Sequence, residues 1–199
     1  MARWEGNTRG RLERAALDLF TEQGYDRTTV AQIAKRAGLT ERSFYRWFTD
    51  KREVLFSGGE ELEKCFVAAI EAVPAGADPL TMLIAAFSKT PEVIRPREFL
   101  RERSAVIDAN PPLRERELIK LADLSQALTS ALERRGVGTE AARLATDAGM
   151  AILGQAGRRW MSDENADHTQ LLADSAADLL AVLTANVPDD ATNRSGRHS

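Results

Sequence analysis

Residues 28–51 read TTVAQIAKRAGLTERSFYRWFTDK, and this stretch decides the fold. It predicts two short helices joined by a tight turn. Thr28 is the predicted N-cap of the first helix and Thr40 that of the second, because a Thr hydroxyl accepts a hydrogen bond from a first-turn N–H. Gly38 lies between them and suits the left-handed backbone at a helix end. The inward positions recur at helical spacing: Val30, Ile33, Ala34 and Ala37, then Phe44, Trp47 and Phe48.

Helical spacing also dominates on both sides of this stretch. Residues 9–23 predict one helix before it, and residues 51–73 predict a longer helix after it. Breaks rich in Pro and Gly then divide the remaining chain into about five further helices, and no segment alternates as a strand would. The predicted fold is therefore all-α, with a three-helix helix-turn-helix head, a helical-bundle body and about nine helices.

The composition excludes several classes of protein. The chain has 199 residues, of which 43% are hydrophobic and 29% charged, as in an ordinary globular protein. One cysteine, Cys65, and two histidines, His168 and His198, provide neither a disulfide nor a metal site, so we expect no cofactor. No nucleotide-binding or nucleophile motif indicates an enzyme. Without a signal peptide or a membrane-spanning run, a cytoplasmic protein that does not associate with membranes is expected.

Positive charge is concentrated at the start of the chain. Residues 1–52 hold 11 Lys or Arg and 7 Asp or Glu, a net charge of +4, whereas residues 53–199 hold 16 and 23, a net charge of -7. A basic head on an acidic body is typical of a head that faces phosphates, although a chance fluctuation of surface charge remains an alternative.

The second helix of the pair presents polar side chains outward, and such a helix fits the major groove of DNA. We therefore expect the outward residues of this second helix to contact DNA, namely Thr40, Arg42, Ser43, Tyr45 and Arg46. A family resemblance adds Thr28, Trp47 and Lys51 to the predicted contacts. Capping alone would also explain Thr28 and Thr40.

The stretch resembles the head of the TetR family of bacterial regulators, which pairs T-T-V-x-x-I-A with G-[VL]-[ST]-x-x-[ST]-[FL]-Y-x-x-F-x-x-K. Residues 28–34 and 38–51 carry the matching positions, and the resemblance covers about the first 55 residues. It implies that Tyr45 and Lys51, like Thr28, touch phosphates. It also implies that Arg42, Ser43 and Arg46 lie near base edges. Trp47 stands where relatives often have His or Tyr, and Arg42 where many have Gly.

The resemblance further implies a body that dimerises and binds a small molecule, and the body looks like that of actinobacterial members with acyl-CoA-like ligand domains. Adaptable apolar walls favour a pocket lined by Phe66, Met82, Phe87, Phe99, Arg103, Met150 and Trp160. Small or apolar faces on the last two helices favour a dimer interface made by Ala148, Ile152, Gln155, Leu172, Ser175, Leu179 and Val182. Packing within one chain is the alternative for both sets.

The expected domains are a helix-turn-helix domain at residues 1–52, a ligand-binding and dimerisation domain at 53–188 and a disordered tail at 189–199. The expected function is that of a homodimeric repressor whose partners are double-stranded operator DNA and a small-molecule effector. A small, largely apolar molecule would release it from a palindromic operator. The alternative is a helix-turn-helix module that binds protein and has no specific DNA target.

Overall fold

The structure is a computed structural model that describes residues 8–185. Within this range the chain forms ten α-helices and one 3-10 helix, η1, and no strand. The prediction of an all-α fold with about nine helices is confirmed. The described residues form ten α-helices, and one of these, α6, is a single turn of four residues. The elements are α1 Thr8–Gln23, α2 Val30–Arg36, α3 Glu41–Tyr45, η1 Glu53–Phe56, α4 Gly59–Ala72, α5 Pro79–Phe87, α6 Thr90–Val93, α7 Arg97–Asp108, α8 Pro111–Arg134, α9 Thr139–Ser162 and α10 His168–Ala185.

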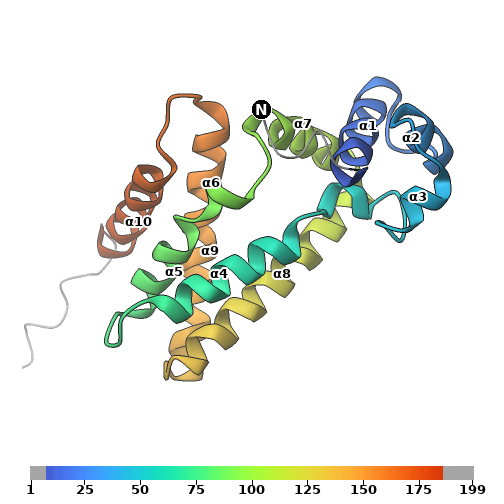
Figure 1. Cartoon of the computed structure of the whole chain (residues 1–199). Coiled ribbons are helices and arrows are strands. Elements are labelled where there is room, and N and C mark those ends of the chain that lie inside the picture. Colours follow the sequence, from blue (N-terminus) through green and yellow to red (C-terminus); the bar gives the residue numbers. More distant parts are fainter. Residues whose placement is uncertain (1–7, 186–199) are drawn as a thin grey trace, which may run out of the picture.

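The head consists of α1, α2 and α3, which lie together at one end of the molecule (Figure 1). The prediction that Thr28 caps α2 is wrong. The cap is Thr29, whose hydroxyl accepts from the Gln32 N–H while the Gln32 side chain accepts from the Thr29 N–H. This reciprocal arrangement is a capping box, and it fixes where α2 begins.

The turn between α2 and α3 depends on Gly38. Its φ is +65°, in the left-handed region, and a Cβ there would lie 2.9 Å from a guanidinium nitrogen of Arg11. That guanidinium donates to the carbonyl of Ala37. Both backbone conformation and space therefore favour glycine at this turn.

The prediction of one continuous helix over residues 51–73 is also wrong. The chain instead forms η1, then an extended residue at Ser57 and a left-handed Gly58 with φ of 95°, before α4 begins at Gly59. The reason is packing: Val54, Leu55 and Phe56 are all buried in the core of the head, which an uninterrupted helix would carry past it.

The body is built around the long helices α8 and α9, with α4 and α5 packed against them and α10 along α9 (Figure 1). Asp78 starts α5 by accepting from the Thr81 N–H, and Pro79 follows at the first helical position. Phe66 of α4 and Phe87 of α5 meet edge to face, with ring centroids 5.2 Å apart, at the centre of the second core.

The core of the head does not end with α3. Val106 and Ile107 of α7 and Leu113 of α8 belong to the same buried cluster as Leu12, Phe20 and the other head residues. Packing is therefore continuous across the domain boundary predicted at residue 52. No helix in residues 8–185 is long and apolar enough to cross a membrane. The tail predicted at 189–199 lies outside the described residues.

Candidate functional site

The outward face of α3 is fixed by the side chains behind it. Phe44 is completely buried and Phe48 nearly so, and their rings lie 5.3 Å apart within the core of the head. At the start of the helix, Thr40 accepts from the Ser43 N–H at 3.2 Å, as predicted for an N-cap. With its inner face anchored and its first turn capped, α3 holds its other side chains in one orientation.

The outer face of α3 and the turn after it carry two unpaired guanidinium groups. Arg42 and Arg46 are exposed and make no ion pair with any residue that the structure describes. Tyr45 is 56% exposed and Trp47 45%, and the Arg46 guanidinium lies 5.9 Å from the Trp47 ring centroid. Trp47 was predicted to point inward, and that is wrong. This face therefore offers charged, hydroxyl and aromatic groups to a partner.

Ser43 is only half-buried, and its hydroxyl lies 3.0 Å from the Thr40 hydroxyl. Thr40 itself is exposed. The two hydroxyls thus form a polar pair at the amino-terminal end of α3, where partial positive charge and free N–H groups favour an anion.

Thr28 lies in the interior, away from this face. It is 1% exposed, and its hydroxyl donates to the carbonyl of Gly24 at 2.9 Å, with Leu19 O a second acceptor at 3.3 Å. Its side chain therefore ties the end of α1 to α2 and has no free hydroxyl for a phosphate. The predicted phosphate contact of Thr28 is corrected for this reason. Thr29 is exposed at the start of α2 instead.

Lys51 likewise holds the head together. Its ammonium donates to three carbonyls, Tyr25 O at 2.8 Å, Thr28 O at 3.0 Å and Asp26 O at 3.3 Å. The same nitrogen lies 4.2 Å from the centroid of the Tyr25 ring. Because an ammonium has three protons, these carbonyls account for all its donors, and a phosphate contact from Lys51 would have to replace one of them.

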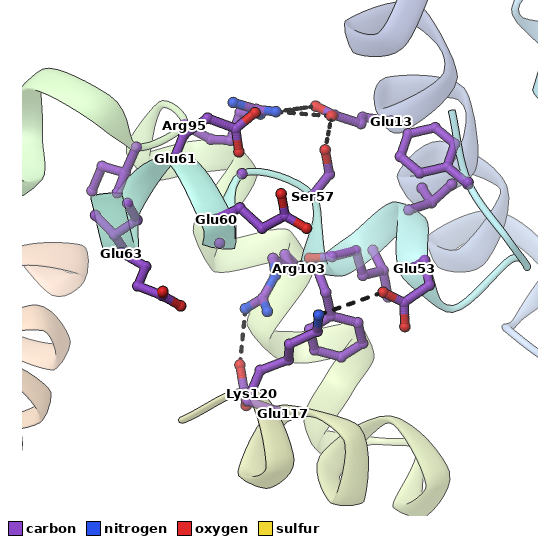
Figure 2. Close-up of a pocket in the computed structure, with 18 of the residues that line it drawn as sticks. Glu13, Glu53, Ser57, Glu60, Glu61, Glu63, Arg95, Arg103, Glu117 and Lys120 are labelled. Carbon is purple, nitrogen blue, oxygen red and sulfur yellow. Dashed lines mark hydrogen bonds and ion pairs between the residues drawn. The ribbon is translucent and has the colours of Figure 1, made fainter. Parts of the chain in front are cut away.

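A cavity of about 620 Å³ lies where the head meets the body (Figure 2). Its wall comes from α1, from η1 and the start of α4, from residues 93–103, and from α8. Sequence reasoning missed this cavity because its lining residues are scattered over more than 100 positions. The clearest available signal was Gly58-Gly59, which marks the break before α4.

A buried ion pair forms one side of this cavity and joins head to body. Both carboxylate oxygens of Glu13 on α1 accept from Arg95 at 2.8 Å, and these residues are 2% and 7% exposed. The Ser57 hydroxyl donates to Glu13 and receives a hydrogen bond from Arg9, which also pairs with Glu61 at 2.7 Å. Burial lowers the pKa of Arg95, although Glu13 opposes this change. Three parts of the chain are thereby tied together.

The seven predicted ligand-binding residues do not share one cavity. Phe99 and Arg103 line the junction cavity, whereas Phe66, Phe87 and Met82 are buried in the core of the body. The remaining two also lie elsewhere: Met150 packs against that core, and Trp160 contacts Arg97 and His168. Most apolar side chains at helical spacing belong to the core of a helical bundle. The alternative of packing within one chain therefore applies to Phe66, Met82, Phe87, Met150 and Trp160.

The predicted dimer residues also divide into two groups. Ile152, Leu172 and Ser175 are at most 3% exposed and pack between the helices of one chain, so their assignment to an intermolecular surface is corrected. Ala148, Gln155 and Leu179 are half-buried, and Val182 is 64% exposed. The large apolar side chains that α9 and α10 expose are Leu144, Leu180, Val182 and Leu183.

A capped recognition-type helix with free arginines, on a three-helix head that continues into a helical body, defines a helix-turn-helix DNA-binding protein. Residues 13–57 match the family model described as bacterial regulatory proteins, tetR family. Residues 13–57 therefore carry a DNA-binding domain of the tetR type, and this match covers the head of the chain.

Similar proteins agree with this assignment. The chain is 44% identical over 80 residues to the HTH-type transcriptional regulator TcmR of Streptomyces glaucescens. These 80 residues are 40% of this chain and 35% of TcmR. Such matches span only 30–43% of the curated relatives' length.

Solved structures show the fold over nearly the whole chain. SmeT, a repressor of Stenotrophomonas maltophilia, is 24% identical with a TM-score of 0.54, covering 89% of this chain and 90% of SmeT. FadR of Thermus thermophilus in complex with lauroyl-CoA is 23% identical with a TM-score of 0.52, covering 94% of this chain and all of FadR. Both proteins are described as repressors, and at this level of identity the likeness to this chain concerns the fold.

Proposed function

We propose that the chain is a homodimeric transcriptional regulator whose α3 reads operator DNA. The observation that carries the proposal is the exposed, unpaired Arg42 and Arg46 on a capped helix anchored by Phe44. An arginine can bind the O6 and N7 of a guanine in the major groove with two hydrogen bonds. Tyr45, Thr40 and Trp47 lie beside these arginines and are the proposed contacts to the DNA backbone.

Dimerisation is proposed through the outer face of α9 and α10. Leu144 is 72% exposed and Leu180 and Leu183 56% and 60%, which is unusual for large apolar side chains unless a partner covers them. A two-fold dimer would place two α3 helices about 34–36 Å apart, or a small multiple of this, and would read a palindromic operator.

Release by a small molecule is the proposed regulation. SmeT is described as a repressor and FadR was solved with lauroyl-CoA, so related folds combine DNA control with ligand binding. In this chain, α4 connects the junction cavity to η1 and the head. We expect the dimer to have two forms that differ in the distance between its heads, only one of which fits the operator. An effector that binds the other form more tightly would weaken operator binding by a few kcal/mol.

Titration of fluorescent duplexes tests the DNA-binding function. We expect the protein to prefer DNA from upstream of its own gene over random duplex at about 150 mM salt. The substitution Arg42→Ala or Arg46→Ala should each cost about 1–3 kcal/mol on the preferred DNA and much less on random DNA. Arg143→Ala, which removes an exposed, unpaired arginine of α9, is the matched control and should change neither affinity.

Equal affinity for upstream and random DNA would contradict the proposal. DNA binding that does not depend on salt would instead favour the protein-interaction alternative, since phosphate contacts release counterions.

A further inference from the structure

We propose that the junction cavity binds an organic cation, meaning an amine or quaternary ammonium group attached to an apolar body. The inference rests on the proposed function, because it names the chemical class of the effector. It deepens the sequence prediction of a small, largely apolar molecule by adding one positive charge.

The cations that line the cavity already have partners. Arg9 pairs with Glu61, and Arg95 pairs with Glu13. On the opposite side, Arg103 donates to the carbonyl of Leu55 and pairs with Glu117 at 2.9 Å. The Lys120 ammonium lies 3.8 Å from Glu53, which also pairs with Arg116. Figure 2 shows the pairs Arg95–Glu13, Arg103–Glu117 and Lys120–Glu53. Each lining cation thus has a carboxylate partner within the chain.

Three carboxylates of the lining are not balanced in this way. Glu60 and Glu63 extend from the first turns of α4, and Asp123 lies on α8. None of the three forms an ion pair with any residue in the part of the chain that the structure describes. Figure 2 shows Glu60 and Glu63 among the side chains around the cavity, on the side opposite Glu117 and Lys120. The four pairs within the lining cancel, Arg116 adds one positive charge beside Glu53, and the three carboxylates outweigh it. The cavity therefore retains net negative charge that attracts cations and repels anions.

The remaining lining is apolar and supplies the rest of the site. Between the charged groups lie side chains from α4, α6, α7 and α8, and the volume of about 620 Å³ falls within the usual range of ligand pockets. These apolar lining residues are Leu62, Val93, Ile94, Phe99, Leu121 and Leu124. The bound molecule must therefore bury hydrocarbon as well as place a charge.

The arginines around α7 oppose the anionic class that an acyl-CoA-like ligand would require. Arg97 donates to the carbonyls of Asp163 and Ala166, and Arg101 pairs with Glu164. With Arg95 and Arg103 also paired, each of the four arginines of this segment is engaged within the chain. Of these four arginines only Arg95 and Arg103 line the cavity, so an anion bound there would compete with Glu13 or Glu117 for its arginine, and a cation would not.

The test uses three probes with the same apolar chain and different charge: octyltrimethylammonium, 1-octanol and octanoate, each below its micellar concentration. Calorimetric titration of the full chain at 150 mM salt should give the tightest binding for the ammonium, with octanoate at least tenfold weaker. The double variant Glu60→Gln/Glu63→Gln should weaken ammonium binding about fivefold or more and leave 1-octanol unchanged.

The control variant Glu133→Gln/Glu140→Gln changes two exposed carboxylates outside the cavity and should alter none of the three affinities. Asp123→Asn gives an independent test from the other wall if the α4 variant does not fold. Octanoate binding as tightly as the ammonium, or ammonium affinity insensitive to both cavity variants, would overturn the proposal. These titrations contain no DNA and therefore test the cation site separately from the proposed function. A protein that binds the ammonium probe but shows no preference for operator DNA would contradict the proposed regulatory function and still support the cation site.

Discussion

At the scale of single residues, Lys51 shows how a motif position can serve the fold. Its ammonium donates to three backbone carbonyls of residues 25–28. In the described head, these hydrogen bonds hold the segment before α2 in place. We expect Lys51→Ala to lower the free energy of unfolding by about 1–3 kcal/mol, because it removes the Lys51 hydrogen bonds to partly buried carbonyls, of which Tyr25 O keeps a second donor, the Thr28 N–H.

Urea unfolding followed by circular dichroism measures this effect. Lys35→Ala removes an exposed lysine of α2 that forms no ion pair among the described residues, and it should change the midpoint little. If Lys51→Ala unfolds at the same urea concentration as the unmodified protein and only loses DNA affinity, Lys51 contacts phosphate after all.

Sequence reasoning at this scale succeeded where periodicity decides and failed where partners are distant. The 3.6-residue period placed Phe44 and Phe48 inside and left Arg42 outside, as the structure has them. Thr28 and Thr29 cannot be told apart by residue type, although Gln32, three positions after Thr29, indicates the capping box. The carbonyls that occupy Lys51 belong to residues 23–26 positions away, and no local pattern indicates them.

At the scale of elements, the buried pair of Glu13 and Arg95 joins α1 to the segment before α7. Removing one member of such a pair leaves a buried charge uncompensated. Glu13→Gln should therefore reduce stability by about 3–5 kcal/mol. Glu22→Gln, on the same helix, breaks an exposed pair with Arg36 and should change stability little. Thermal and urea unfolding of the two variants compare them directly, and equal losses would show that the junction does not depend on Glu13.

The contact between α9 and α10 contains a histidine that titrates. His168 is 4% exposed with its Nδ1 unbonded, and its ring meets Trp160 edge to face. Burial lowers the pKa of His168, with Arg97 acting in the same direction and Asp167 against it. The unfolded chain therefore binds more protons below about pH 6.5, and stability falls as pH decreases through that value.

The variant His168→Phe lacks this titration. We expect the unmodified protein to lose stability relative to His168→Phe when the pH is lowered from 7.5 to 5.5, because every other titrating group is common to both. Melting temperatures of the two proteins across this range measure the difference. A constant difference would mean that His168 has the same pKa folded and unfolded.

The break before α4 explains why element boundaries were less predictable than element types. Residues 51–73 carry a helical pattern throughout, but Val54, Leu55 and Phe56 pack into the head and Phe66 and Ile70 into the body. One straight helix cannot serve both cores, and Gly58 allows the change of direction. The sequence shows the two apolar groups but not that they face different cores.

At the scale of the whole molecule, the proposed pairing of two chains is tested by the mass in solution. We expect a mass in solution of about twice 21.9 kDa by light scattering. Leu180→Glu/Leu183→Glu should shift it to the monomer and weaken operator binding, since charge would have to be buried in an apolar interface. Leu118→Glu/Ile119→Glu, on exposed positions of α8, is the control and should remain dimeric. A monomeric unmodified protein would contradict the proposed assembly.

The fold class followed from the sequence, whereas the cavity did not. Helical periodicity and the motif at 28–51 are local signals, and they sufficed for an all-α chain with a helix-turn-helix head. The junction cavity brings together Glu13, Glu60, Phe99 and Asp123 from four separate helices. Its existence depends on how those helices pack, which no local pattern specifies.

Sequence-specific DNA binding by α3 is the central property proposed for this protein. The measurement that tests it is selection of bound duplexes from a randomised pool by the purified protein at about 150 mM salt, followed by sequencing. We predict enrichment of an inverted repeat whose half-sites are centred about 10 base pairs apart, or a multiple of this, with loss of enrichment for Arg42→Ala/Arg46→Ala. A bound pool with the same sequence composition as the starting pool would contradict sequence-specific DNA binding by α3.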